Sequence, residues 1–141
     1  MLDHSRDLTA AAQKHSVKHV THILNCNNNL PYWEIMSTLI APQGSICLLS
    51  STGQPIDLDR FMDKSVTICW ELMYTRSLYG TDDMGRQRDI LNRIADMVES
   101  GLIRSTLTRC LGPLSTTTAA SAHEILENRT MIGKLVMTEI S

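Results

Sequence analysis

Three histidines near the start of the chain have the spacing of a potential metal site. His15, His19 and His22 would share one face of a helix, and neutral imidazoles on one face can bind zinc. The neighbouring Val17 and Val20 are β-branched, however, and they favour a strand over a helix. We therefore interpret the histidines as surface or structural residues and predict no metal site.

Two adjacent carboxylates form the next group that could do chemistry, as an acid and a base. Asp82 and Asp83 follow Thr81 directly before a segment with helical periodicity, where negative charge is favourable. We interpret these three residues as helix caps. The glycines are isolated and none begins a phosphate-binding turn, so the residues alone identify no reaction.

The cysteines are too widely spaced to form a recognisable motif. No Cys-x-x-Cys is present, and three of the four lie inside apolar runs, where a free thiol behaves as a small hydrophobic residue. We interpret all of them as reduced core residues, with neither disulfides nor metal: Cys26, Cys47, Cys69 and Cys110.

Composition excludes several classes of partner. With 141 residues, 43% of them apolar, the chain can bury one ordinary core. Its net charge of −2 and scattered basic residues predict binding neither to nucleic acid nor to an anionic membrane. No run reaches the ~18 apolar residues of a membrane helix, and the first residues lack a signal pattern, so we expect a cytoplasmic protein.

Hydrophobic periodicity in the first half of the chain predicts alternating helices and strands. The run at 45–50 suits a strand buried on both faces, as in a parallel sheet covered by helices. In such a sheet ligands bind at the carboxyl ends of the strands, so positions just after Cys26 and Ser50 are candidate contacts. The predicted elements are a helix at 8–15, a strand at 17–26, a helix from 31 to 40 that ends before Pro42 and Gly44, and strands at 45–50 and 66–72.

The second half opens with the most regular helical pattern in the chain. Its apolar stripe predicts a helix that Gly101 ends. The stripe consists of Ile90, Leu91, Ile94, Met97 and Val98. The remaining predictions are a strand at 105–110, a turn at Gly112-Pro113, a helix at 116–128 and a strand at 134–138.

Several stretches resemble the tail of the medium-chain dehydrogenase/reductase superfamily, in its zinc-type alcohol dehydrogenase-like and quinone oxidoreductase-like branch. The most specific are Trp70-Glu71-Leu72-Met73-Tyr74-Thr75-Arg76-Ser77, and Leu107 to Pro113 after the long helix. Ala122-His123 to Gly133-Lys134-Leu135-Val136 is similar to the closing helix and Gly-Lys-hydrophobic strand of that superfamily. Asp3 to Asp7 is similar to the polar turn after a middle strand of its nucleotide domain.

This resemblance implies an α/β fold, a partial Rossmann domain with a doubly wound parallel sheet. Complete relatives are more than twice as long, so the chain would enter midway through their Rossmann domain. Residues 1–104 would be the second half of that nucleotide-binding domain. Residues 105–141 would be the return segment of the GroES-like catalytic domain. The glycine-rich phosphate turn and the strand end that selects NADH or NADPH would be missing.

The resemblance also implies which residues contact the cofactor. Asn25 and Cys26 would end a strand beside the ribose, and Ser50 and Ser51 would lie in the loop near the nicotinamide. The nicotinamide side would be lined by Glu71, Leu72 and Met73. Lys134 would approach the phosphates as a flexible point charge. Each has a plainer interpretation: strand cap, turn residue, exposed charge or surface lysine.

The activity implied is hydride transfer between NADPH, or NADH, and a small-molecule carbonyl, enone or quinone, without zinc. The chain alone would be inactive unless a longer product or a partner supplies the rest. A homodimer through the edge strand at 66–72 is expected, because truncation uncovers sheet edges. Two alternatives stay open: a non-catalytic oligomerising fragment, and an unrelated α/β binding domain with its ligand past Cys26 and Ser50.

Overall fold

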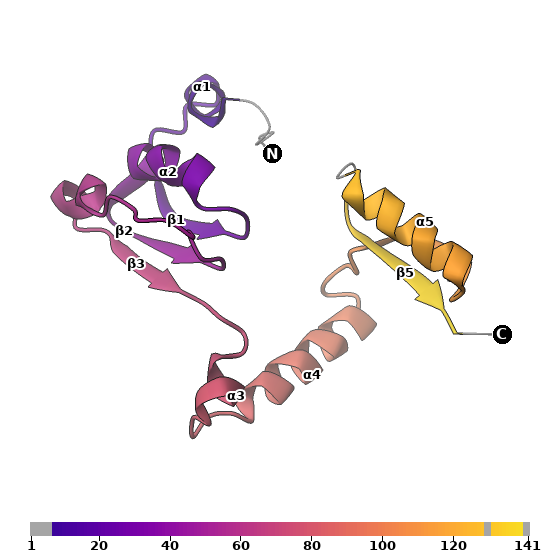
Figure 1. Ribbon diagram of the computed structural model, residues 1–141. Coiled ribbons are helices and arrows are strands. Elements are labelled where there is room, and N and C mark those ends of the chain that lie inside the picture. Colours follow the sequence, from indigo (N-terminus) through magenta and orange to yellow (C-terminus); the bar gives the residue numbers. More distant parts are fainter. Residues whose placement is uncertain (1–6, 129–130, 140–141) are drawn as a thin grey trace. The chain divides into compact units, whose positions relative to one another are not determined.

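The computed structural model describes residues 7–128 and 131–139 (Figure 1). The chain divides into two compact units, Met1–Asp82 and Asp83–Ser141. This division follows contacts within the chain, whereas the boundary after Arg104 concerns the domains of complete relatives and stays a prediction. Among the described residues, no helix has the length and apolar character needed to cross a membrane.

Three parallel strands form the sheet of the first unit, in the order β1-β2-β3. Helical segments make both crossovers. The helix between β1 and β2 was predicted from the sequence, whereas the helical segment between β2 and β3 was not. The elements in chain order are α1 (Leu8–Lys14), β1 (Val20–Asn25), η1 (Leu30–Tyr32), α2 (Trp33–Leu39), β2 (Ile40–Leu48), η2 (Asp59–Lys64), β3 (Thr67–Trp70) and α3 (Thr75–Tyr79). The predicted helices at 8–15 and 31–40 and all three strands are confirmed, with shifted ends.

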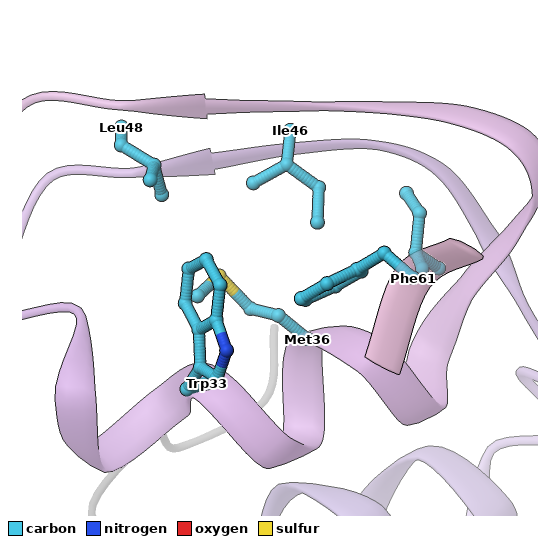
Figure 2. Close-up of a cluster of buried hydrophobic side chains, with 6 residues drawn as sticks. Trp33, Met36, Ile46, Leu48 and Phe61 are labelled. Atoms are coloured by element: carbon cyan, nitrogen blue, oxygen red, sulfur yellow. The ribbon is translucent and has the colours of Figure 1, made fainter. Parts of the chain in front are cut away.

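One face of this sheet packs on α2 and η2 to form the core (Figure 2). Ile46 and Leu48 of β2 are fully buried there. Trp33 of α2 and Phe61 of η2 meet edge to face, with ring centroids 5.0 Å apart. The Trp33 indole Nε1 donates a hydrogen bond to the Asp57 carbonyl, 3.0 Å away, so the ring is anchored at its polar end.

Strand β2 begins earlier than predicted. The helix ends at Leu39, and Ile40 already has extended backbone angles, so Pro42 and Gly44 lie within the strand. A register shift occurs here, because Val20 pairs with Ile40 whereas His22 pairs with Ser45. A Cβ at Gly44 would come within 2.6 Å of the Ile40 side chain, so close packing excludes a larger residue.

The expectation that β2 is buried on both faces is wrong. Side chains alternate along a strand, so Cys47 points away from the face of Ile46 and Leu48. Among the described residues that second face is partly exposed: Leu24 on β1 is 64% exposed and Cys69 on β3 is exposed. The four cysteines are free thiols, as expected, but Cys26, Cys69 and Cys110 are exposed and Cys47 is only half-buried, so they are not core residues.

The second unit pairs two strands in parallel, β4 (Leu107–Pro113) and β5 (Lys134–Thr138). Helix α5 (Thr116–Glu127) packs on β4 and begins with a capping box between Ser115 and Thr118. These elements confirm the predicted helix and final strand. The predicted turn at Gly112-Pro113 is wrong, because the pair lies inside β4, where the register shifts and Gly112 has φ 85°.

The long helix α4 (Arg86–Glu99) confirms the periodic pattern, but two details differ. Its N-cap is Gly85, which has no side chain that could cap the helix. Thr81, Asp82 and Asp83 lie before this residue and are therefore not the cap. Gly101 follows its C-terminus with φ 74°, as predicted. The apolar stripe is exposed, with Leu91 at 59%.

The side chain of Lys64 joins the two crossovers of the first unit. From the end of η2, its Nζ donates hydrogen bonds to three carbonyls at the end of α2 and the start of β2. The acceptors are Ser37 at 2.7 Å, Thr38 at 3.2 Å and Ile40 at 3.0 Å. A cation here offsets the partial negative charge at the carboxyl end of α2.

Replacing Lys64 with Met should therefore destabilise the first unit. Methionine keeps much of the apolar stem but leaves these carbonyls without the ammonium donor, at a cost of about 1–3 kcal/mol in the free energy of unfolding. Urea unfolding followed by tryptophan fluorescence measures this change. Lys18→Met, at an exposed position, is the control, and equal stability of the two variants would contradict the assigned role.

Candidate functional site

The carboxyl ends of the three parallel strands lie in register at one edge of the first unit. Asn25 pairs with Leu48, and Leu48 pairs with Trp70. Backbone hydrogen bonds continue past the strands, from the Leu49 N–H to the Asn25 carbonyl at 3.2 Å and from the Glu71 N–H to the Leu48 carbonyl at 3.0 Å. The segments that follow the three strands therefore start side by side.

Seven of the eight predicted cofactor contacts belong to this edge. They are the last residue of β1 or lie within three residues after the ends of β1, β2 and β3: Asn25, Cys26, Ser50, Ser51, Glu71, Leu72 and Met73. The register thus brings together residues that are up to about fifty positions apart in the sequence. Their contact with a cofactor stays a prediction.

A buried amide pair joins the ends of β1 and β2. The Asn25 Nδ2 donates to Asn29 Oδ1 at 2.9 Å, and the Asn29 Nδ2 donates to the Ser50 carbonyl at 2.7 Å. Asn29 is fully buried and Asn25 is 9% exposed. The Asn25 Oδ1 also accepts the Asn27 N–H, at 3.0 Å. Both the amide nitrogen and the amide oxygen of Asn25 therefore make hydrogen bonds within the protein.

Asn29 is the residue of this site that sequence reasoning missed. It stands in the run Asn27-Asn28-Asn29, which indicates strand ending and helix capping, but nothing in the run distinguishes one asparagine from another. Only the fold shows that the third of them reaches Ser50 across the crossover. The polar run after an apolar strand was the available signal.

The two serines also have internal roles. Ser50 Oγ donates to the Asn27 carbonyl at 2.8 Å, which closes a second link between the loops after β1 and β2. Ser51 Oγ accepts the Gly53 N–H at 3.2 Å and is exposed. These contacts agree with turn-forming roles for both residues, and Ser51 keeps a hydroxyl proton to donate.

The groups left accessible at this edge have a mixed chemistry. Cys26 and Glu71 are exposed, and Leu72 and Met73 are 49% and 59% exposed. A carboxylate suits the hydroxyls of a ribose as an acceptor, and apolar side chains suit the flat face of a nicotinamide ring. The residues present therefore fit the nicotinamide nucleoside part of a dinucleotide.

An apolar hollow lies beside this edge, between β1, α1 and α2. Its volume is about 470 Å³, and Asn25, Cys26 and Asn27 line its polar end. Its other lining residues are Leu8, Val20, Ile23, Leu24, Tyr32, Ile35, Met36 and Leu39. The hollow borders β1, which has no second neighbouring strand among the described residues.

Lys134, the eighth predicted contact, belongs to the second unit. It is the first residue of β5, it is exposed, and its backbone N–H donates to the Thr106 carbonyl at 2.7 Å. The preceding Gly133 has φ 92°, and a Cβ there would collide with Thr108. The packing of β4 on β5 thus requires glycine at position 133. This requirement explains the glycine of the Gly-Lys pattern without any bound ligand.

No group of three His, Cys, Asp or Glu residues within 7–128 and 131–139 is arranged to hold a metal ion. His22 lies on β1, and His15 and His19 lie outside helix and strand, so the three share no helical face. The β-branched neighbours therefore predicted correctly that these three histidines do not lie along one helix. The expected absence of zinc from the whole protein stays a prediction.

Comparison with known proteins decides the family. A family model described as zinc-binding dehydrogenase matches residues 2–137. The chain belongs to the zinc-binding dehydrogenase family. It is 33% identical over 137 residues to a zinc-type alcohol dehydrogenase-like protein of Staphylococcus epidermidis, a match that covers 97% of this chain and 41% of that protein. Similar proteins of Staphylococcus aureus match to the same extent.

Solved structures agree with this assignment. A putative zinc-dependent alcohol dehydrogenase from Rhizobium etli superposes with a TM-score of 0.84 at 32% identity, covering 99% of this chain and 40% of that one. A quinone oxidoreductase of Pseudomonas syringae has a TM-score of 0.67 at 15% identity, which shows the shared fold alone. The resemblance to the medium-chain superfamily and the partial α/β fold are confirmed, and an unrelated α/β binding domain is excluded.

The chain spans about two fifths of the length of these relatives. The family assignment therefore concerns a part of the relatives' fold.

Asn29→Ala should destabilise the first unit by about 1–3 kcal/mol, because the buried Asn25 amide and the Ser50 carbonyl would both lose a partner. Urea unfolding of the purified chain measures the change. Asn28→Ala is the matched control, since Asn28 is exposed and its side chain only accepts the Leu30 N–H. Asn29→Asp separates the two bonds, because an ionised carboxylate still accepts from Asn25 but cannot donate to Ser50. Equal effects of Asn29→Ala and Asn28→Ala would contradict the bridging role.

Proposed function

We propose that this chain carries the nicotinamide side of the cofactor site of an NADPH-dependent oxidoreductase. The reaction is hydride transfer between the cofactor and a small-molecule carbonyl, enone or quinone. The observation that supports the proposal is the in-register edge where the segments after β1, β2 and β3 meet. In open α/β sheets, ligands bind at this edge. The names of relatives that mention alcohol dehydrogenase support a small-molecule carbonyl or alcohol as the substrate class.

The bound nicotinamide would supply the hydride, and the residues of this chain would bind and orient it. Leu72 and Met73 offer apolar surface to the ring, and Glu71 offers a carboxylate to ribose hydroxyls. Asn25 and Ser50 act indirectly, because their side chains are committed to Asn29 and Asn27 and keep the strand ends together.

Cys26 and Ser51 complete the edge with a thiol and a hydroxyl that are accessible. Lys134 would add a positive charge near the cofactor phosphates. No zinc takes part in the proposed reaction. We place the protein in the cytoplasm, which fits its free thiols.

The remaining part of the cofactor site would come from a longer product or from a partner chain. The described residues contain no glycine-rich turn for the diphosphate, and the chain spans two fifths of its relatives. Hydride transfer by the 141 residues alone is therefore not expected.

The test is an NADPH titration of the purified chain followed by tryptophan fluorescence. Trp70 is 54% exposed at the end of β3, directly before Glu71, so cofactor binding should quench it. A half-site predicts a Kd on the order of 1 mM. Lys134→Ala should raise that Kd about three- to tenfold, because one charge-assisted contact is lost.

Three controls make the titration decisive. Lys18→Ala changes a lysine that the proposal does not use and should leave the Kd unchanged. Trp70→Phe should remove the quenching signal. A titration with NADH under the same conditions tests the preference for NADPH. Absence of saturable quenching up to several millimolar cofactor would overturn the proposal.

A second candidate is a homodimer through β3, with or without catalysis. β3 has β2 on one side and no neighbouring strand on the other among the described residues. Exposed apolar side chains follow it, including Leu72, Tyr74 and Leu78. An open strand edge next to apolar surface favours pairing with a second copy about a two-fold axis.

Trp70→Pro tests this pairing. The Glu71 N–H bonds to β2, so the N–H of the preceding Trp70 points to the open edge, and proline would remove it without breaking the ladder. The dimer dissociation constant should rise about tenfold or more, since each copy loses a backbone hydrogen bond. Trp70→Thr keeps the N–H and serves as control. Analytical ultracentrifugation measures both, and a monomeric parent chain would refute the dimer.

A further inference from the structure

Two cysteines lie side by side on the open face of the three-stranded sheet. Cys47 of β2 pairs in register with Cys69 of β3. Both alternate with residues of the covered face, because Ile46 and Leu48 flank Cys47 and are buried in the core. The two thiols therefore project from adjacent strands on the side that α2 and η2 do not cover.

The spacing of these strands suits a bond between the sulfurs. Neighbouring strands lie about 4.8 Å apart, and the Cα atoms of a disulfide are usually about 4.4–6.8 Å apart. Neither of the other two cysteines pairs in register with a cysteine on a neighbouring strand. Leu24, and not Cys26, is the β1 partner of Cys47, and Cys110 pairs with Val136 in the second unit.

The surroundings give the two thiols different roles. Cys69 is exposed, and its Sγ donates a weak hydrogen bond to the Ile46 carbonyl at 3.6 Å. Cys47 is half-buried. Burial raises the pKa of Cys47, and a hydrogen bond with the Cys69 thiol and the nearby Glu71 carboxylate raise it further. Cys69 is thus the accessible sulfur, and Cys47 is the protected sulfur beside it.

We propose that Cys47 and Cys69 form a dithiol modification site, which a low-molecular-weight disulfide such as glutathione disulfide oxidises to a bond between β2 and β3. The inference rests on the sheet alone and does not require the proposed cofactor site. The bond would form directly before the edge that carries Glu71, so it would tie the ends of β2 and β3 together at that point.

The reaction is an ordinary thiol–disulfide exchange in two steps. The Cys69 thiolate attacks one sulfur of the small disulfide, whose S–S bond breaks and releases one thiol. Cys47, after losing its proton, then attacks the Cys69 sulfur of the mixed disulfide, and the second small thiol leaves. The protein loses two electrons and two protons, which reduce the small disulfide to two thiols.

The experiment is equilibration of the purified 141-residue chain in glutathione redox buffers, followed by alkylation of free thiols and mass spectrometry of the intact chain and its peptides. We expect a chain without bound glutathione that lacks two free thiols, with a Cys47–Cys69 peptide link. Ring closure should be at least about tenfold faster in the native chain than in the urea-unfolded chain, because the fold holds the sulfurs adjacent.

Three variants separate the possible pairs. Cys47→Ser should stop at a stable mixed disulfide on Cys69, whereas Cys26→Ser and Cys110→Ser should close the ring as the parent does. A link between Cys26 and Cys69 that survives in Cys47→Ser would overturn the assignment. So would glutathione adducts without ring closure in the native parent chain, or links only between copies. Circular dichroism of each variant confirms that it is folded before the comparison.

Discussion

The first unit depends on the position of β2 between two parallel neighbours. Because β2 pairs with both β1 and β3 in register, their carboxyl ends meet at one edge. The same register places Ile46 and Leu48 against Trp33 and Phe61, which gives the unit its core. It also sets Cys47 beside Cys69. Core, candidate site and dithiol therefore all follow from one strand alignment.

The loops at this edge are held by amides and a serine rather than by charges. Asn29 connects Asn25 to the Ser50 carbonyl, and Ser50 connects back to Asn27. A buried polar group without a hydrogen-bond partner destabilises the fold, whereas a fully paired network favours one arrangement of the chain. This network therefore determines where the loops leave the sheet. Accessible groups such as Glu71 can then act on a ligand without being needed for the fold.

Local sequence patterns predicted most elements but not their surroundings. The stripe of α4 and the β-branched runs at 66–72 and 134–138 identified elements correctly, because periodicity is a property of the element itself. Burial depends on what covers an element, so the apolar run 45–50 was wrongly expected to be covered on both faces. Gly112-Pro113 was wrongly expected to form a turn, because strand pairing overrode turn chemistry.

The candidate site could be predicted only in part. Strand ends indicated the region after Cys26 and Ser50, and resemblance added Glu71, Leu72, Met73 and Lys134. The contact of Asn29 with Ser50 spans 21 positions and depends on the crossover geometry, which no local pattern encodes. The pairing of Cys47 with Cys69 likewise depends on register, which the sequence alone did not determine.

The sheet of the first unit has different outer edges, and this asymmetry has a consequence for assembly. Pairing of β3 with β3 of a second copy closes a two-fold dimer and uses up that edge. Pairing of β3 with the outer edge of β1 in the next copy would instead be heterologous and leave one free edge at each end. Such head-to-tail contacts form a closed ring if the rotation between copies closes, and a filament if it does not. A strand that covers the outer edge of β1 would therefore stop this head-to-tail assembly.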